Sequence, residues 1–467
     1  MKNQPAVVRL QSLLGSFGRS DQGNIAILFA IAVVPVITFV GAAVDYTRAN
    51  TARSSMQAAM DSASLMLAKD LQDGTINTSQ ITQKAQDYFK ALYTNPDAKS
   101  VGVTATYTAA AGNGSKIEIA GNGKIDTSFM RLVGIPDIKF NTNATSAWGN
   151  VRMRVAMALD VTGSMADDGK MPAMQTAAKS LIDQLSPLAK NPGDIYISVV
   201  PFAKDVNIGT NYVNQTWIDW SLWEAANGTC SRTSYTNKSS CENNNRTWTP
   251  ANRNTWTGCV TDRTQPYDTQ NTAPTQTTVA TLFPAEEYYE NSQTYCKPGN
   301  NPKLQQIVPL SYDWSSIKTT INAMQPTGGT NQPIGLAWAW QSLQQTAPLN
   351  APAEDTANYT YKKAIILLSD GLNTEDRWPS YGDGRTQFSG QIDARQRILC
   401  DNIKAQGVTI YTVQVNTGTG TNADPTSAVL QYCASGTDKF YLVTTATQTL
   451  TVFTAIGTSL AKLRVYR

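Results

Sequence analysis

Residues 155–164 read VAMALDVTGS, an apolar run that ends in an aspartate and is followed by two side chains with hydroxyl groups. Such a run is typical of a buried strand, and in parallel sheets the ligand-carrying loops follow the carboxyl ends of strands. Residues 364–371, AIILLSDG, repeat the pattern. We therefore expect the two loops to meet at one edge of a sheet.

We expect five side chains with oxygen atoms to converge there, two carboxylates and three hydroxyls. One of the hydroxyls comes from a third stretch, the turn Gly329-Thr330-Asn331. The five residues are Asp160, Thr162, Ser164, Thr330 and Asp370. Oxygen ligands suit Mg²⁺, Ca²⁺ or Mn²⁺ better than zinc or copper. Each motif alone would be an ordinary turn. In this order the motifs predict a divalent-cation site, with Mg²⁺ as the first candidate, whereas Asp167 and Asp168 predict an exposed acidic loop.

From about Arg152 onward, strand-like and helix-like segments alternate. The expected strands are VAMALD, IYISVVPF, AIILLSD, VTIYTVQV and KFYLV, and the expected helices are Met171 to Leu188, Ile334 to Leu343, Ile392 to Ala405, one near Val429, and Thr447 to Leu463. This alternation predicts an α/β fold with a doubly wound, mainly parallel sheet.

Asp-x-Thr-Gly-Ser, a later Thr and a still later Asp together resemble the metal-ion-dependent adhesion site of von Willebrand factor A domains. That family usually has Ser where Thr162 stands, and Thr keeps the hydroxyl. The resemblance implies a Rossmann-like fold in which the hydroxyls contact the metal and the carboxylates act directly or through water. It also implies an open metal position for a carboxylate of a partner protein, and hence adhesion, not catalysis.

Near the amino terminus, Ile25 to Val44 form a twenty-residue run without a charge. At 1.5 Å per residue this run matches the roughly 30 Å of a bilayer core. We expect one transmembrane helix over 25–44, with residues 1–24 in the cytoplasm. The alternative is a signal peptide, cleaved at Gly41-Ala42-Ala43.

All six cysteines follow this run: Cys230, Cys241, Cys259, Cys296, Cys400 and Cys433. The charges that flank the run barely favour an amino terminus on the inside, so the orientation is decided by the cysteines. An even number of cysteines in an exported domain of low charge indicates disulfides, although buried thiols in a cytosolic protein are the alternative. We expect Cys400 and Cys433 to join two helices, and the other pairings stay open.

Residues 45–150 predict a small α+β, pilin-like region. The helix should continue from Asp45 to Leu71, and a second helix, Ile81 to Tyr93, precedes the alternating runs VGVTATYT, KIEIAG and IKFNTN. The segments DQGNIAILFAI and VDYTRANTARSSMQAAMDSASL resemble the amino termini of Tad-type (Flp) pilus-assembly proteins of the TadE/TadG kind. Prepilin peptidase sites carry a Glu five residues after the Gly, whereas here Leu28 stands five residues after Gly23. We therefore expect the segment not to be processed and to remain as a permanent anchor.

An insertion of about 205–302 interrupts the domain over 151–467. It is rich in Asn and Thr and carries four cysteines and Trp217, Trp220, Trp223, Trp248 and Trp256. A free loop of this length would be unusual, which predicts a disulfide-rich subdomain. The Trp residues predict a local core, with an exposed carbohydrate-binding platform as the alternative. The Tad resemblance extends through this insertion and nearly the whole chain.

Composition excludes several functions. The 467 residues contain no histidine, which removes Ser-His-Asp and Cys-His catalytic pairs. A net charge of +3 without a basic cluster gives no footprint for nucleic acid. The resemblance implies a non-enzymatic, single-pass protein of the bacterial inner membrane, largely periplasmic, that binds pilus-assembly proteins. A surface adhesin for host protein or glycan is the first alternative, and a metal-dependent hydrolase, which lacks an obvious general base, is the second.

Overall fold

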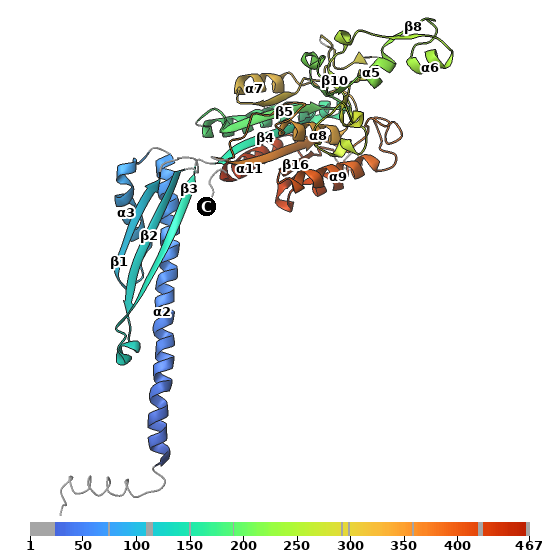
Figure 1. Ribbon diagram of the computed structural model, residues 1–467. Helices are drawn as coiled ribbons and strands as arrows, with labels where there is room; N and C mark the ends of the chain where they lie inside the picture. The colour runs from blue at the N-terminus through green and yellow to red at the C-terminus, as the bar shows by residue number, and fades with distance from the viewer. Residues whose placement is uncertain are drawn as a thin grey trace, which may run out of the picture. The chain divides into compact units, whose positions relative to one another are not determined.

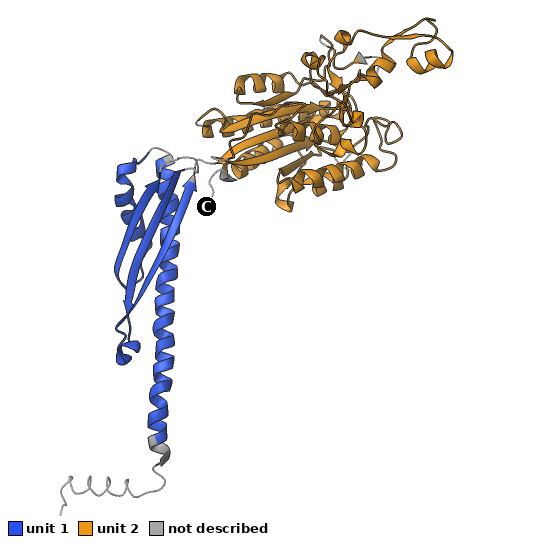
Figure 2. Cartoon of the chain, in the orientation of Figure 1, with its two compact units in different colours: residues 1–148, 467 blue, residues 149–466 orange. Residues whose placement is uncertain are grey.

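The computed structural model describes residues 24–72, 75–108, 115–148, 151–189, 191–290, 293–297, 299–356, 359–418 and 424–463. The expected cytoplasmic segment 1–24, except Asn24, and Gly23 of the prepilin comparison lie outside the described residues. The chain forms two compact units, Met1–Trp148 with Arg467, and Gly149–Tyr466 (Figure 2). We call them unit 1 and unit 2.

Unit 1 is organised around one long helix, α2 (Asn24–Gln72), which extends well beyond the rest of the unit (Figure 1). Among the described residues it is the one helix long and apolar enough to cross a membrane. Helix α3 (Ile81–Leu92) and an antiparallel sheet in the order β1-β2-β3 pack on its carboxyl-terminal half. The strands are β1 (Ala98–Thr108), β2 (Ser115–Asp126) and β3 (Asp137–Trp148).

Periodicity explains this packing. Ile117, Ile119 and Ile125 lie at alternate positions of β2 and are fully buried, as are Met56 and Met60 at helical spacing on α2. A strand presents every second side chain to one face and a helix every third or fourth, so these two rows form one core.

Unit 2 contains a mixed sheet in the order β10-β6-β5-β4-β15-β16-β17, with β14 also paired to β5. The contacts β5–β4, β4–β15, β15–β16 and β16–β17 are parallel, and those of β6, β10 and β14 are antiparallel. The strands are β4 (Val151–Asp160), β5 (Ile195–Phe202), β6 (Val206–Asn207), β10 (Cys259–Val260), β14 (Val308–Ser311), β15 (Thr360–Ser369), β16 (Thr409–Val415) and β17 (Phe440–Val443).

Helices supply side chains to two separate cores. Val155, Met157 and Leu159 of β4 belong to one core, and Ala156 and Ala158 to the other, so β4 is buried on both faces. The first core includes residues of α4 (Lys170–Leu185), α7 (Trp314–Asn322) and α11 (Gln448–Leu463), and the second those of α8 (Gln332–Ser342), α9 (Gln391–Ala405) and α10 (Ala428–Cys433). The prediction of a mixed α/β chain is confirmed.

The insertion is folded from short elements. They are β7 (Ile218–Asp219), α5 (Ser221–Ala226), β8 (Gly228–Cys230), α6 (Lys238–Asn243), β9 (Trp248–Pro250), β11 (Phe283–Pro284), β12 (Tyr289–Glu290) and β13 (Gln293–Thr294). Helix α5 contains Trp223 but not Trp217 or Trp220, so their helical spacing does not place them on one helix. All three side chains are nevertheless buried, which agrees with a local core.

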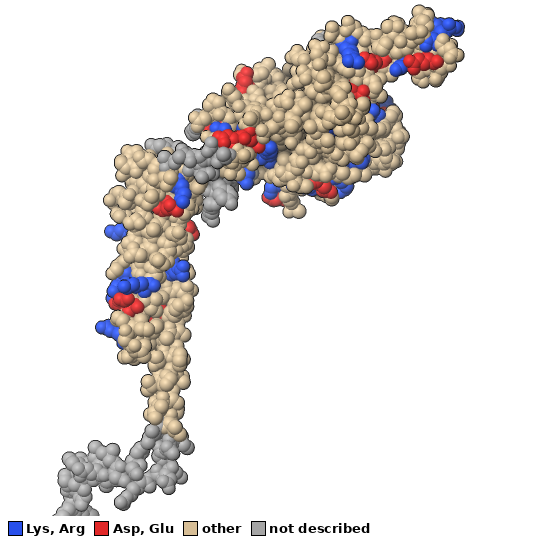
Figure 3. Space-filling view, viewed as in Figure 1, with Lys and Arg blue, Asp and Glu red and all other residues tan. Residues whose placement is uncertain are grey.

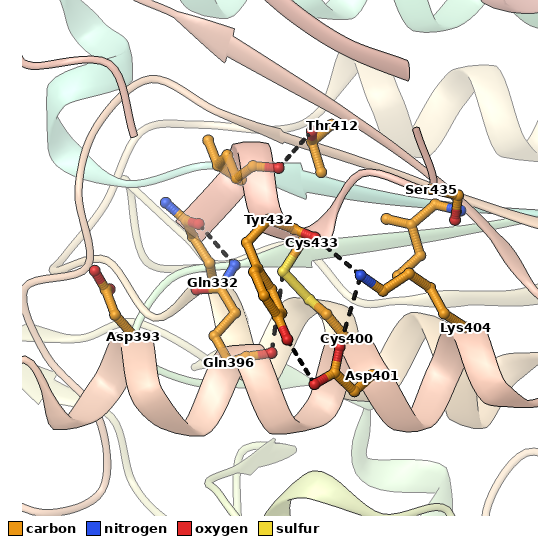
Figure 4. Close-up of a disulfide and its surroundings, with 12 residues drawn as sticks. Gln332, Asp393, Gln396, Cys400, Asp401, Lys404, Thr412, Tyr432, Cys433 and Ser435 are labelled. Carbon is orange, nitrogen blue, oxygen red and sulfur yellow. Dashed lines mark hydrogen bonds and ion pairs between the residues drawn. A yellow bond between two sulfur atoms is a disulfide. The ribbon is translucent and has the colours of Figure 1, made fainter. Parts of the chain in front are cut away.

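Three disulfides confirm the expectation from the cysteine count. The pairs are Cys230–Cys241, Cys259–Cys296 and Cys400–Cys433. The last joins α9 to α10, the two helices that it was expected to join (Figure 4). Beside it, the Tyr432 hydroxyl donates a hydrogen bond to the carboxylate of Asp401 at 2.7 Å.

Candidate functional site

The site lies where β4 and β15 end. Leu159 and Leu368 are opposite each other in these parallel strands, so Asp160 and Ser369 follow at the same edge of the sheet. Ser369 Oγ donates a hydrogen bond to Asp160 Oδ2 at 2.5 Å, and Asp370 is the next residue. The two apolar runs therefore deliver their polar residues to one place.

The loop after β4 adds two hydroxyls. The Thr162 N–H donates to Asp160 Oδ1 at 2.8 Å, which folds the loop back over the aspartate. The Thr162 and Ser164 hydroxyl oxygens lie 3.3 Å apart, and Ser164 Oγ donates to Asp370 Oδ1 at 2.8 Å. These hydrogen bonds thus link four of the five predicted residues to one another.

Thr330 reaches the same edge through its backbone. The Gly163 N–H donates to the carbonyl of Gly328 at 2.9 Å, so the two loops are adjacent. Thr330 is held by its own N–H, which donates to Thr374 Oγ1 at 2.9 Å, and by its carbonyl, which accepts from the Thr374 N–H. Among the described contacts, no hydrogen bond joins the Thr330 hydroxyl to the other four predicted residues.

The two carboxylates are buried, with exposed fractions of 0% for Asp160 and 2% for Asp370. Burial, and then the charge of Asp370, raise the pKa of Asp160 to about 7. Burial also raises the pKa of Asp370, although Lys170 and Ser164 oppose the rise. Two neighbouring carboxylates that are buried away from solvent can both ionise only if a positive charge lies beside them.

Lys170 supplies such a charge and was missed in the sequence. It is the first residue of α4, and its Nζ lies 2.9 Å from Asp370 Oδ2 and 3.3 Å from the Ser164 carbonyl oxygen. A lysine in the first turn of the helix after the motif was the available signal. Gln332, also missed, donates through Nε2 to Ser369 Oγ at 3.1 Å and so orients the bond from Ser369 to Asp160.

The insertion also contributes to the site, which no sequence pattern indicated. The fully buried Tyr288 accepts a hydrogen bond at Oη from the Gly329 N–H at 2.9 Å. Gly328 has φ +70°, and a Cβ at this position would collide with the Tyr288 hydroxyl. Glycine is therefore required here both for the left-handed backbone and for the close approach of the insertion.

The other acidic residues considered in the sequence are Asp167 and Asp168. Asp167 and Asp168 are exposed, as expected, and Asp168 accepts a hydrogen bond from Thr417. Within the part of the chain that the structure describes, no group of three or more His, Cys, Asp or Glu residues could hold a metal ion. A cation here would depend on the combination of two carboxylates with hydroxyls.

Comparison with known proteins gives one family match. The family described as "Putative Flp pilus-assembly TadE/G-like" matches residues 23–68, within and just before α2. The comparison with curated proteins found no match.

Several solved structures are similar to this chain. The pilus adhesin SpaC of Lactobacillus rhamnosus GG shares 11% identity at a TM-score of 0.37, over 79% of this chain and 35% of the adhesin. The vWF domain of the type V pili tip protein Mfa5 of Porphyromonas gingivalis shares 10% identity at 0.35, over 68% and 98%. Proximal thread matrix protein 1 of the mussel byssus shares 13% at 0.30, over 67% and 46%. The chain thus spans about a third of the Lactobacillus adhesin.

Proposed function

We propose that the chain is a membrane-anchored component of a Tad-type (Flp) pilus or secretion assembly, and that unit 2 binds a partner protein through a metal-ion-dependent adhesion site. The observation that carries the proposal is the meeting of the two loops, through the bonds from Ser164 to Asp370 and from Ser369 to Asp160. In this proposal unit 2 is a von Willebrand factor A domain, with a doubly wound, mainly parallel sheet.

The donor atoms present fit a divalent cation. Asp160, Thr162, Ser164 and Asp370 would hold it, with Thr330 reaching it from the adjacent loop. All five offer oxygen, and the two buried carboxylates provide the negative charge that Mg²⁺ requires. When bound, the cation would present an open position to a carboxylate of the partner. Such a metal-bridged contact needs no catalytic base, and the proposed function is therefore binding and not catalysis.

The anchor and the compartment rest on unit 1 and on the cysteines. The Tad-like match covers residues 23–68, and α2 is long and apolar enough to cross a membrane. Every cysteine of unit 2 is in a disulfide. Since disulfides persist in oxidising compartments, the proposal places unit 2 in the periplasm of a bacterium, anchored by a single pass in the inner membrane.

Deletion of the chain tests assembly against adhesion. An assembly component is needed before fibres form, so the deletion strain should lose surface pili in electron micrographs. Asp370→Ala should cause the same loss while the protein stays abundant in the membrane, and Asp167→Ala, on the exposed loop, should not. Normal pili that fail to bind host ligand would instead establish the alternative, a surface adhesin that uses the same site.

Co-purification identifies the partner. The intact chain should retain a pilus-assembly protein in Mg²⁺ and release it in EDTA, since a bridging cation would be removed. The Asp370→Ala variant should fail to retain that protein under either condition. A partner that stays bound in EDTA, or to the variant, would show that its binding does not use this site.

A further inference from the structure

The turn between β2 and β3 of unit 1 exposes large apolar side chains. It contains a 3-10 turn, η3 (Met130–Val133), and the exposed fractions are 83% for Leu132, 55% for Val133 and 41% for Ile135. Scattered apolar residues on a surface are ordinary, but a cluster at the tip of one turn marks a contact with another surface. The tip is closed by its own bonds, including that from the Thr127 N–H to the Pro136 carbonyl at 3.1 Å.

A buried carboxylate fixes this turn against α2. Asp45, which is fully buried, accepts hydrogen bonds from the backbone N–H groups of Ser128, Phe129 and Met130 at 3.0, 2.8 and 2.9 Å. Gly41, one helical turn earlier, lies so close to Phe129 that a Cβ there would collide with its ring. The turn is therefore locked at the level of residues 41–45.

That level is where the uncovered part of α2 begins. Every side chain from Leu28 to Val40 is exposed or half-buried, and Gly41 is the first buried residue from Leu28 onward. Figure 3 shows no charged residue on the visible, described face of this uncovered segment, and the sequence has none between Ile25 and Val44. The segment 24–40 rises about 26 Å, close to the roughly 30 Å of a bilayer core. A membrane crossed by α2 would thus end near residue 41, beside the turn.

We propose that the apolar tip of the β2–β3 turn inserts Leu132, Val133 and Ile135 into the lipid leaflet on the unit 1 side of the membrane. The inference rests on the proposed membrane anchoring of α2. A bilayer is the favoured occupant because the tip is continuous with the uncovered apolar helix. Arg131, exposed in the same turn, can extend to lipid phosphates, as basic residues at a membrane surface do. The inserted turn would fix how deeply α2 lies in the membrane. It would also stop unit 1, of which α2 is a part, from rotating about the α2 axis.

Spin-label accessibility in bilayer nanodiscs tests the proposal on the full chain. The structure has no free cysteine among its described residues, so a Leu132→Cys variant carries one reactive site for a nitroxide. Val36→Cys, on the exposed part of α2, is the lipid reference. Thr106→Cys is the aqueous reference, because it pairs with Glu118 far along the sheet from the turn. Collision with oxygen reports lipid, and collision with a water-soluble nickel complex reports water.

The label at position 132 should match that at position 36, with an oxygen-to-nickel ratio several-fold above that at position 106. A ratio equal to that at position 106, with position 36 in lipid, would overturn the insertion and leave the anchor intact. A water-exposed position 36 would overturn the anchor, and the insertion with it. A label shielded from both reagents, or broadened by a second label, would show that protein covers the turn and would also overturn the proposal.

Discussion

Ser164 and Asp370 lie 206 residues apart in the sequence and are joined by a hydrogen bond of 2.8 Å from the serine hydroxyl to the carboxylate. The bond connects the loops that follow two adjacent parallel strands, β4 and β15. The oxygen atoms proposed as ligands are therefore gathered by the fold itself. A cation would find most of its site already assembled.

Divalent cation should stabilise the protein. Mg²⁺ or Mn²⁺ at 100 times its dissociation constant should add about 2.7 kcal/mol to the free energy of unfolding. Asp160→Ala and Asp370→Ala should remove this gain, and Asp167→Ala should keep it. Thermal unfolding of the full chain in detergent, with cation or with EDTA, measures the effect. If a variant that carries both Asp160→Ala and Asp370→Ala responds to cation like the wild type, the site is wrongly placed.

Lys170 should compete with the cation. A charge-assisted hydrogen bond contributes on the order of 1.5 kcal/mol, so Lys170→Met should tighten cation binding about tenfold. Lys179→Met is the control, because Lys179 lies on the same helix but bonds to Asn322. Titration calorimetry with Mn²⁺ compares the variants. Weaker binding by Lys170→Met would show that the lysine supports the site.

The stability of the cation-free protein should fall as pH rises from about 4 to about 7. Burial, and then Asp370, raise the pKa of Asp160 to about 7, so the folded state holds a proton that the unfolded state releases near pH 4. Asp160→Asn should reduce this dependence but not abolish it, because burial also raises the pKa of Asp262 to about 6 and that of Asp376 to about 7. Asp167→Asn should leave it unchanged. Urea unfolding in EDTA across this pH range measures the change. A wild-type stability that rises over the same range would contradict the assignment.

Removal of the Cys400–Cys433 disulfide should destabilise unit 2. Its two cysteines are 33 residues apart. Closing a loop of this length restricts the unfolded chain and so raises the free energy of unfolding by about 3 to 4 kcal/mol. Replacing both cysteines by alanine should cost more than the same change at Cys230–Cys241, whose separation is 11. Peptide mapping without reductant checks the pairing, and urea unfolding measures the difference. Equal losses would show that loop length does not decide the effect.

Gly328→Ala should disrupt the loop that carries Thr330. The left-handed backbone alone costs about 1 to 2 kcal/mol for an L residue, and the new methyl group would also meet Tyr288. Gly169→Ala isolates the backbone cost, because Gly169 has φ +71° and a methyl group added there would have no neighbour within 4 Å among the described residues. The Gly328 variant should lose more stability and more cation affinity than the Gly169 variant. Equal losses would mean that the insertion does not support the loop.

The sequence predicts the central strands because burial on both faces makes them continuous apolar runs. The run at 155–160 ends at the same residue as β4, and IYISVVPF coincides with β5. Elements of two residues, such as β6 and β7, are too short to show a period and could not be predicted.

At the site, the motif residues could be predicted because each follows a recognisable strand or turn. Lys170 left a signal that was missed, since it stands in the first turn of the helix after the motif. Tyr288 could not be predicted, since its role depends on the reach of a side chain between segments distant in sequence. Tyr288 reaches Gly329 across 41 residues, and no spacing rule links such a pair.

The pairing of β10 with β6 limits how unit 2 can be re-engineered. Strand β10 belongs to the insertion, yet it forms the edge of the main sheet and leads to Tyr288 beneath the Gly329 loop. Excising 205–302 would remove the edge strands β6 and β10 from the sheet and would remove Tyr288, which supports the Gly329 loop. Grafting the insertion onto another scaffold would fail for the same reason. A chimera between related chains should exchange everything from the end of β5 to the start of β14 as one cassette.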